Sequence, residues 1–428
     1  MTLPTFKFGL LATTCFGLAL PAMAQETAPA TVASAPTETE MLRAQLEALQ
    51  AQVDALKEKV AAMSAAASAP VSTAASASAP AATPAAAAPA TAVVSAARSA
   101  PSEPKTKIGG TIFFNVTNIN QKFDGTKQSV NGLQTDMKRF YLSVDHRFDD
   151  VFSANLTTDF NYVSNDSQTQ LFVKKAYLQA KLSDAFTARV GAADMPWVPF
   201  VEKLYGYRYI ENIMIDRTKY GTSTDWGVHA FGDVADGMFS YAFSAVNGAG
   251  YKKLTRSKTV DFEGRLGFKP VKNVTLGVGG YSGKLGKNIQ GIGTQHRATR
   301  LNAVAAYTTD KIRVGGEYFT AKNWNNVTTV VEDKSEGWSG FASYQVMPQV
   351  GVFGRYDWVK PSKLINPDLR GNYFNVGVSY APIKGIDLAL AYKRDEADNG
   401  TISTSNGTIG GTREGTYDEI GVWGQVKF

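Results

Sequence analysis

The sequence predicts an all-β fold, a 16-stranded antiparallel transmembrane β-barrel over residues 105–428, and three observations predict it. Apolar and polar side chains alternate with a period of two, as where Phe140 and Leu142 alternate with Arg139 and Tyr141. The gaps between such segments are short and long in strict alternation, which is typical of the periplasmic turns and external loops of outer-membrane barrels. The last segment also alternates and ends on Phe428, which resembles the signal used for outer-membrane barrel assembly.

The alternating segments favour a membrane barrel over a soluble fold. Roughly half of the strand residues are apolar and would overfill a closed core, whereas a barrel of sixteen strands is wide enough to hold water. Aromatic residues at strand ends on the apolar face predict interface girdles: Phe148, Phe160, Trp226, Phe268, Tyr318, Trp338, Trp358 and Tyr380. The expected strands are 107–121, 136–148, 151–163, 169–182, 186–194, 222–232, 237–247, 258–268, 273–283, 296–308, 311–320, 336–347, 350–359, 371–381, 386–395 and 415–428.

The first residues predict a secretory signal peptide, 1–24. An apolar run from residue 8 to 20 follows Lys7 and is too short to cross a bilayer as a helix. Ala22-Met23-Ala24 then supplies a small-x-small cleavage site. The only cysteine, Cys15, lies inside this segment, so the mature chain is expected to contain neither a disulfide nor a cysteine metal site.

A heptad pattern predicts a coiled-coil helix at 37–64, after a flexible segment at 25–36. Thr37 and Glu40 fit a capping box at its start. An isolated amphipathic helix is the alternative, and the residue types at the seam lean towards a dimer. The apolar seam consists of Leu42, Leu46, Leu49, Val53, Leu56, Val60 and Met63. Residues 65–104 are rich in Ala, Ser and Pro and are expected to form an extended linker, so this arm would lie in the periplasm.

The composition argues against several function classes. The net charge of +6 is dispersed, without a basic helix or cluster, so a surface or lumen that favours anions is expected and nucleic-acid binding is not. His146, His229 and His296 are far apart in the strand map, and no nucleophile–base–acid set or metal spacing is present. We therefore expect neither an enzyme nor a cofactor or metal site.

The gap at 195–221 is the longest, and it follows the fifth expected strand as the third external loop. It is aromatic and apolar, so it needs a surface to pack on, and the inner barrel wall is the natural one. An external lid or a trimer contact is the alternative. Folding inward would place seven residues at a pore constriction: Glu202, Lys203, Tyr205, Tyr207, Arg208, Tyr209 and Glu211.

Charged strand residues are expected on the lumen side, because Lys or Arg facing lipid at the midplane costs about 2–4 kcal/mol. For each of them, solvation of the wall or ion pairing competes with a role in selectivity. The basic residues assigned to the lumen wall are Arg139, Arg147, Lys175, Lys181, Arg189, Arg265, Arg300, Arg313, Arg355 and Lys393. The acidic residues are Asp145, Asp159, Asp225, Asp261, Glu263, Asp357 and Asp387.

Several fragments, densest over 136–270, together resemble the phosphate-selective porin O and P family. They are Met137 to Leu142, Lys175 to Leu178, Arg189 to Gly191 with Pro196, Pro199 and Phe200, Asp225 to Val228, Tyr241 to Gly248, and Arg265 to Phe268. The resemblance implies a homotrimeric sixteen-stranded porin with an inward third loop. Phosphate-selecting members line one wall with an arginine ladder, whereas the lumen bases here are mixed with acids.

The expected function is therefore an outer-membrane porin of a Gram-negative bacterium, a water-filled channel for passive diffusion of small hydrophilic solutes. It would be general or mildly anion-selective, with phosphate among the candidate solutes. The expected partners are outer-membrane lipid, other copies of the chain and, through Phe428, the barrel-assembly machinery. Two alternatives remain at this point: a sugar-specific or oligosaccharide-specific porin with Tyr205, Tyr207 and Tyr209 as an aromatic track, and a structural barrel that anchors the outer membrane through its arm.

Overall fold

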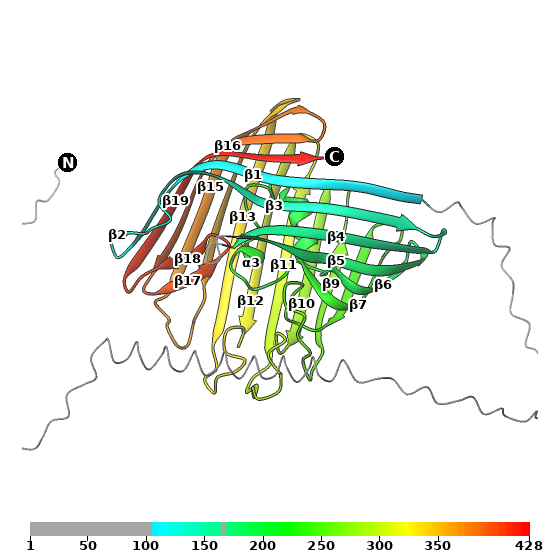
Figure 1. Ribbon diagram of the computed structural model, residues 1–428, viewed down its shortest axis with the longest axis horizontal. Coiled ribbons are helices and arrows are strands. Elements are labelled where there is room, and N and C mark those ends of the chain that lie inside the picture. The colour runs from blue at the N-terminus through cyan, green and yellow to red at the C-terminus, as the bar shows by residue number, and fades with distance from the viewer. Residues whose placement is uncertain (1–104, 164–167) are drawn as a thin grey trace, which may run out of the picture. The chain divides into compact units, whose positions relative to one another are not determined.

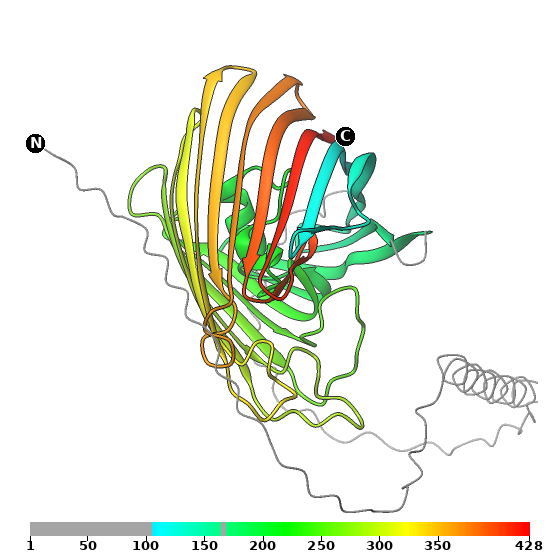
Figure 2. The ribbon, with the colours of Figure 1, turned by 90° about the vertical axis from the view of Figure 1, so that its left-hand side faces the viewer.

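The computed structural model describes residues 105–163 and 168–428, and these form a closed antiparallel β-barrel (Figures 1 and 2). The predicted signal peptide, coiled-coil helix and linker lie outside the described residues. No helix among the described residues is long and apolar enough to cross a membrane.

Sixteen long strands build the barrel within the described residues. Each strand pairs with its neighbour in the chain, and β1 pairs with both β3 and β19, which closes the sheet. The strands are β1 (Lys105–Phe123), β3 (Gly132–Arg147), β4 (Phe152–Val163), β5 (Gln168–Ser183), β6 (Phe186–Asp194), β7 (Thr224–Val234), β8 (Phe239–Val246), β9 (Asp261–Phe268), β10 (Val274–Gly283), β11 (Ala298–Thr308), β12 (Ile312–Lys322), β13 (Lys334–Met347), β14 (Val350–Lys360), β15 (Arg370–Ile383), β16 (Ile386–Asp398) and β19 (Glu414–Lys427). The predicted fold is confirmed, and each expected strand corresponds to one of these.

Three smaller strands and two short helices lie in the connections. The strand β2 (Thr126–Lys127) pairs antiparallel with the end of β1 in the first external loop. β17 (Thr401–Thr404) and β18 (Gly407–Gly410) form a separate hairpin in the last external loop. The helices α2 (Val198–Tyr205) and α3 (Met214–Arg217) belong to the third external loop and lie within the barrel outline in Figure 2.

The period-two alternation separates an apolar outer face from a polar inner face. On the outer face Val116, Leu156 and Leu266 are exposed, as expected for side chains that meet lipid. Aromatic side chains such as Trp338 and Tyr380 are also about half exposed there. The inner face carries buried polar residues, and the main apolar core lies between this face and the third loop rather than between two sheets.

Two of the β-bulges interrupt the alternation on β3 and β5, the strands on either side of β4. In β3 the register with β1 shifts so that Lys138 has no partner of its own, and in β5 the register with β4 shifts in the same way at Lys174. A bulge adds one residue to one strand and thereby redirects a side chain. Both lysines, which strict alternation assigns to the lipid face, therefore turn inward.

Candidate functional site: the third external loop and the lumen wall

The third external loop, which we call L3, comprises residues 195–223 between β6 and β7 and packs on the inside of the barrel. Pro199 lies in the first turn of α2, where a missing backbone N–H costs nothing. Gly206 ends the helix with a φ of 81°, and its N–H bonds to the carbonyl of Glu202. L3 contacts the inner faces of β9–β16, which we call the covered wall. The inner faces of β1 and β3–β6, which we call the open wall, touch L3 only in places, as where Phe113 packs with Tyr209, and otherwise border spaces in the lumen.

Bases of the covered wall hold L3 by its backbone and by one carboxylate. Each of these bases contacts a different part of the loop, so L3 is attached to the wall along its whole length. The contacts are Arg265 Nε to the Pro196 carbonyl at 3.1 Å, Arg313 to the Lys203 carbonyl at 3.0 Å, Arg355 to the Asn212 carbonyl at 2.7 Å, Arg300 to the Tyr220 carbonyl, and Lys393 to the Glu211 carboxylate at 3.2 Å. Half of the ten predicted wall bases thus act as anchors for the loop.

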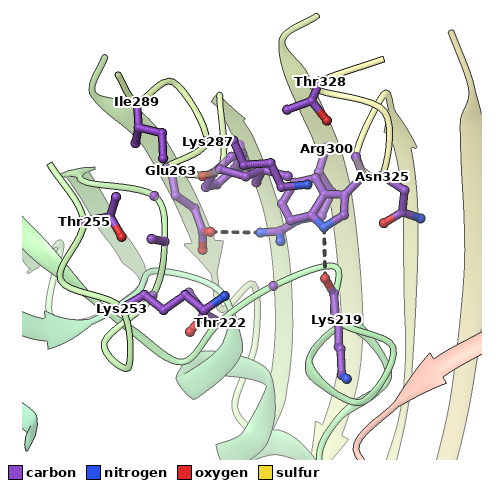
Figure 3. A pocket seen from close by; sticks show the side chains of 18 of the residues that line it. Lys219, Thr222, Lys253, Thr255, Glu263, Lys287, Ile289, Arg300, Asn325 and Thr328 are labelled. Carbon is purple, nitrogen blue, oxygen red and sulfur yellow. Dashed lines mark hydrogen bonds and ion pairs between the residues drawn. The ribbon is translucent and has the colours of Figure 1, made fainter. Parts of the chain in front are cut away.

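The charges of the covered wall are also paired with one another in buried positions. Arg300 contacts Glu263 at 3.0 Å, and both side chains are at most 2% exposed (Figure 3). From L3, Arg217 contacts Asp357 at 3.1 Å and Asp395 at 2.8 Å. Buried charges require partners because desolvation is costly. Although Glu263 and Arg300 border a pocket, their side chains expose almost no surface to it, and these charged groups are committed to structure.

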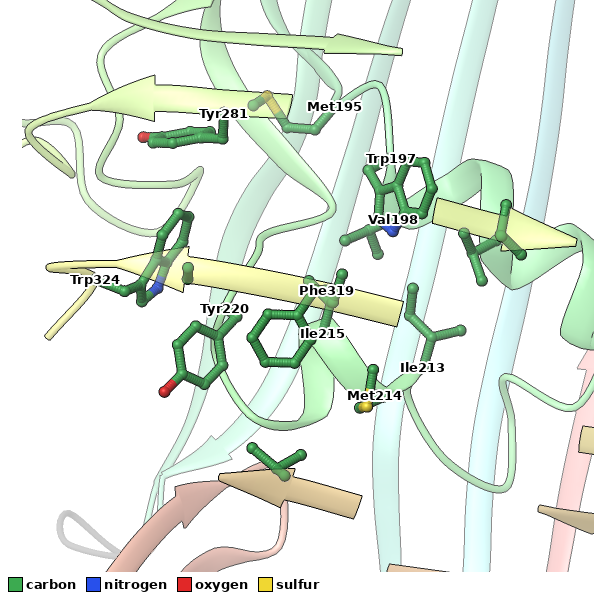
Figure 4. Packing of buried hydrophobic residues seen from close by; sticks show 14 of the residues in the cluster. Met195, Trp197, Val198, Ile213, Met214, Ile215, Tyr220, Tyr281, Phe319 and Trp324 are labelled. Atoms are coloured by element: carbon green, nitrogen blue, oxygen red, sulfur yellow. The ribbon is translucent and has the colours of Figure 1, made fainter. Parts of the chain in front are cut away.

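An apolar layer completes the attachment of L3 to the covered wall (Figure 4). Trp197 is fully buried, and its indole N–H donates to Glu317 at 2.7 Å. Gly279 of β10 provides the room for this ring, because a Cβ there would lie 2.6 Å from it. Other members of the layer include Met195, Val198, Ile213, Met214, Ile215, Tyr220, Tyr281, Phe319 and Trp324.

The three predicted constriction tyrosines pack against the covered wall. Tyr207 stacks on Phe353 with ring centroids 4.3 Å apart. Tyr205 accepts a hydrogen bond from Asn375 at 3.1 Å and is buried. Tyr209 is 4% exposed. The three tyrosines therefore stabilise the contact between L3 and the wall, and little of their aromatic surface is left exposed to bind a sugar.

The free face of L3 carries Glu202, Lys203 and Arg208. The guanidinium of Arg208 lies 2.5 Å from the carboxylate of Glu202. Opposite them, across a space of about 450 Å³, is the open wall. The charged side chains around this space are the bases Lys174, Lys175, Lys203, Arg208 and Lys427 and the acids Asp194 and Glu202. Bases therefore outnumber acids around this space.

Lys174 and Lys138, the two bulge residues, are additions to the wall bases expected from sequence. Lys174 donates to the hydroxyl of Tyr141 at 3.0 Å and lies over the ring of the same residue. Lys138 lines an outer space together with Glu211 and Glu419. The sequence contained a signal for both bulges, because each lysine directly precedes another base within a strand. Without a bulge, perfect alternation would place one of the two adjacent bases in lipid.

The other predicted wall bases lie on the open wall and at the periplasmic rim. Arg139 pairs with Asp159 at 2.8 Å and Lys175 with Asp194 at 2.7 Å. Arg189 bonds to Gln179 and lies over the ring of Tyr177. Lys181 pairs with Asp184 beside a turn, and Arg147 is exposed at the end of β3. Most of these pairs are partly exposed, so water and solute can compete with them.

Two carboxylates of L3 have shifted pKa values of opposite sign. Burial raises the pKa of Glu202 above its ordinary value, and the nearby Arg208 opposes this shift. Burial acts in the same direction on Glu211, but Lys393 and Lys138 outweigh it and hold the pKa of Glu211 below its ordinary value. Glu211 is thus a fixed anion, and Glu202 is the titratable group of the free face.

The described residues do not assemble a catalytic or metal-binding set. Among them, no group of three or more His, Cys, Asp or Glu side chains could hold a metal ion. His229 bonds to Ser244 at 2.8 Å, His146 bonds to Thr106, and His296 lies in an external loop. The chemistry that the lumen offers is that of a charged, water-facing passage.

Comparisons with a protein family and with solved structures agree with this geometry. Residues 61–400 match the model of the Gram-negative porin family. An anion-selective porin from Comamonas acidovorans superposes with a TM-score of 0.58 at 14% identity, over 76% of this chain and 100% of that chain. The outer membrane channel DcaP of Acinetobacter baumannii superposes with a TM-score of 0.55 at 12% identity, over 76% and 98% of the two chains.

OmpT, an outer membrane protein of Vibrio cholerae in its trimer form, superposes with a TM-score of 0.53 at 13% identity, over 76% of this chain and 100% of that chain. At such identities these structures show a shared fold only. No curated protein matches the sequence. The family match covers most of the chain, and the closed barrel with its lumen indicates a channel rather than an enzyme. The chain belongs to the Gram-negative porin family and is an outer-membrane β-barrel channel.

Proposed function

We propose that this porin is a passive diffusion channel for small hydrophilic solutes with a mild preference for anions, phosphate among them. The observation that carries the proposal is the excess of bases over acids around the open passage beside Arg208 and Lys174. A narrow passage lined by one sign of charge raises the local concentration of the opposite ion. The constriction is formed by the free face of L3 opposite the open wall.

The same geometry argues against a phosphate-specific channel of the O and P type. A selective arginine ladder needs guanidinium groups that face the solute in sequence along one wall. Here Arg300 and Arg355 are buried and committed to acids and to L3. We propose that phosphate permeates as one small anion among several. A sugar track is not favoured, because Tyr205, Tyr207 and Tyr209 pack on the covered wall.

The test is recording from the purified protein in planar bilayers. In a KCl gradient the reversal potential should show chloride permeating more readily than potassium. Phosphate added to one side should carry current, and maltodextrins should not block the channel at concentrations that block a sugar-specific pore. A preference for potassium would contradict the proposal, and a folded barrel without channels would favour a structural anchor.

We further propose that the porin assembles as a homotrimer and that residues 37–64 form a coiled-coil arm in the periplasm. OmpT of Vibrio cholerae, a structural neighbour, has a trimer form. Phe428 is 64% exposed at the end of β19 and is available to the barrel-assembly machinery. The mass of the detergent-solubilised protein, with and without residues 37–64, tests the oligomeric state and the contribution of the arm.

A further inference from the structure

A second external loop also folds into the barrel. It is the last one, residues 399–413 between β16 and β19, and it carries the β17–β18 hairpin. At its tip the backbone N–H of Ser405 donates to the Arg217 carbonyl at 2.8 Å, and the Ser405 hydroxyl donates to Glu211 at 2.7 Å. From L3, the ammonium of Lys219 donates to Ser403 at 2.7 Å. The tip of the hairpin therefore rests on L3.

The position of Glu211 shows how far the hairpin reaches inward. Glu211 pairs with Lys393, which lies on β16 well before the external end of that strand at Asp398. At a rise of about 3.3 Å per residue, the five intervening steps correspond to roughly 16 Å of strand. A tip that contacts Glu211 has thus turned back into the lumen, and β18 also contacts the barrel strands β1, β16 and β19.

The inward position is supported along the whole hairpin. Ile402 and Ile409 are almost fully buried and pack with Ala397 and Tyr417 on the inner face of β16 and β19. Gly410 has a φ of 111°, and a Cβ there would lie 2.1 Å from the carbonyl of Gly400, so the stem requires glycine.

The base of the loop has its own anchor. The carboxylate of Asp124 accepts hydrogen bonds from the backbone N–H groups of Thr412, Arg413 and Glu414 at 2.7, 2.8 and 3.0 Å. These bonds hold the pKa of Asp124 below its ordinary value. The loop is therefore tied at its base, middle and tip.

We propose that the β17–β18 hairpin is a second constriction element, which together with L3 and the outer part of the open wall sets the size of solute that can enter. The proposal rests on the proposed channel function and adds a filter to it. The tip faces β1 and β3 across a space of about 720 Å³, whose lining includes Asn406, Lys138, Arg139 and Arg208. A solute from outside meets this space before the passage beyond Arg208.

Asn406 is the residue of the tip best placed to contact a solute. The residue is partly exposed and lines the outer space beside the bases Lys138 and Arg139 of the open wall. A group attached at this position would therefore project into that space.

Cysteine modification tests whether Asn406 lines the conducting path. In the full chain with Cys15→Ala, the Asn406→Cys variant is treated from the external side with 2-sulfonatoethyl methanethiosulfonate during bilayer recording. Single-channel conductance should fall by about half, because an added sulfonate group narrows an already restricted path. The control is Val330→Cys in the loop between β12 and β13, where the side chain is 78% exposed; its modification should leave the conductance unchanged.

A second pair of variants tests the docking of the hairpin without changing its length. Ile402→Asn with Ile409→Asn removes the apolar attachment, and conductance should rise by about 1.5- to 2-fold as the hairpin leaves the lumen. Val330→Asn with Val331→Asn is the matched control, since both side chains are exposed on a loop that contacts solvent. It should conduct like the unaltered protein.

The outcomes separate this proposal from the channel function itself. If the unaltered protein conducts, but mass spectrometry shows complete modification at residue 406 with unchanged conductance, the second constriction is wrong and the channel function stands. Unchanged conductance in the folded Ile402→Asn/Ile409→Asn variant has the same meaning. If the unaltered protein forms no channels, the channel function has failed.

Discussion

The covered wall and the open wall carry the same kinds of charged residue, but the residues serve different ends. Under L3, Arg300 and Arg355 are fully surrounded by acids, carbonyl groups and aromatic rings. Across the lumen, Lys174 and Lys175 remain partly exposed beside water. The difference is produced by one loop: wherever L3 lies, wall charges become structural, and only the uncovered half of the barrel remains available for selectivity.

The largest effect should come from removing a base of the covered wall. Arg300→Ala leaves the carboxylate of Glu263 buried without its partner and frees the Tyr220 end of L3. Because breaking a buried ion pair is costly, the free energy of unfolding should fall by about 3–5 kcal/mol. Chemical denaturation of the protein refolded into detergent or lipid measures this change.

The matched variant on the open wall is Lys175→Ala, which breaks a partly exposed pair with Asp194. The free energy of unfolding should change by at most about 1 kcal/mol. Equal losses for the two variants would mean that the two walls do not differ as described.

The apolar attachment of L3 should matter almost as much as the ionic one. Trp197→Ala removes a fully buried ring and the hydrogen bond to Glu317, so unfolding should become easier by about 3–5 kcal/mol. Bilayer traces should also show more current fluctuation, because L3 loses its contact with β10 and β12. Trp197→Phe keeps an aromatic ring in the cavity and should lose less free energy of unfolding. A Trp197→Ala channel with unchanged stability and no added current fluctuation would show that L3 is held by other contacts.

Selectivity, in contrast, should respond to the open wall. Lys174→Gln with Lys175→Gln removes two positive charges from the passage, and the ratio of anion to cation permeability should fall by about twofold. Reversal potentials in a KCl gradient measure the ratio. Lys311→Gln, in an exposed periplasmic turn, is the control for net charge and should leave the ratio unaltered.

The smallest effect should be a pH dependence that arises from Glu202. Because burial raises the pKa of Glu202, this carboxyl takes up a proton at a higher pH than an ordinary glutamate does. As the pH falls, Arg208 loses its counter-charge and the anion preference should increase, by less than about twofold. Glu202→Gln should remove this step and hold the preference at its low-pH level; a step that persists in the variant would assign it to another group.

Much of the fold could be predicted from sequence, because a membrane barrel leaves a direct pattern in it. Lipid on one side and water on the other require alternation, and residues such as Leu142 and Leu156 fall on the expected face. Strand number and loop order followed from the alternating gap lengths. The bulges at Lys138 and Lys174 were not predicted, because a one-residue register shift depends on the neighbouring strand.

The candidate site was predictable as a set of residues but not as an arrangement. Alternation placed Arg265, Arg300 and Arg313 towards the lumen, yet it could not show that each would contact the L3 backbone. The aromatic content of L3 indicated that it needs a packing surface, without showing that Tyr207 would stack on Phe353. The inward turn of the last loop, with Ser405 on Glu211, left no periodic signal at all.

By itself, then, the sequence determined the strands, their two faces and, apart from the bulge residues Lys138 and Lys174, the side of the barrel on which charges lie. It could do so because the membrane acts on every residue of a strand in the same way. Only the tertiary structure decided which charges remain free, because that depends on where two loops pack among strands far away in the chain. Arg300 and Lys175 look alike in the sequence, but one is buried against Glu263 and the other borders the open passage.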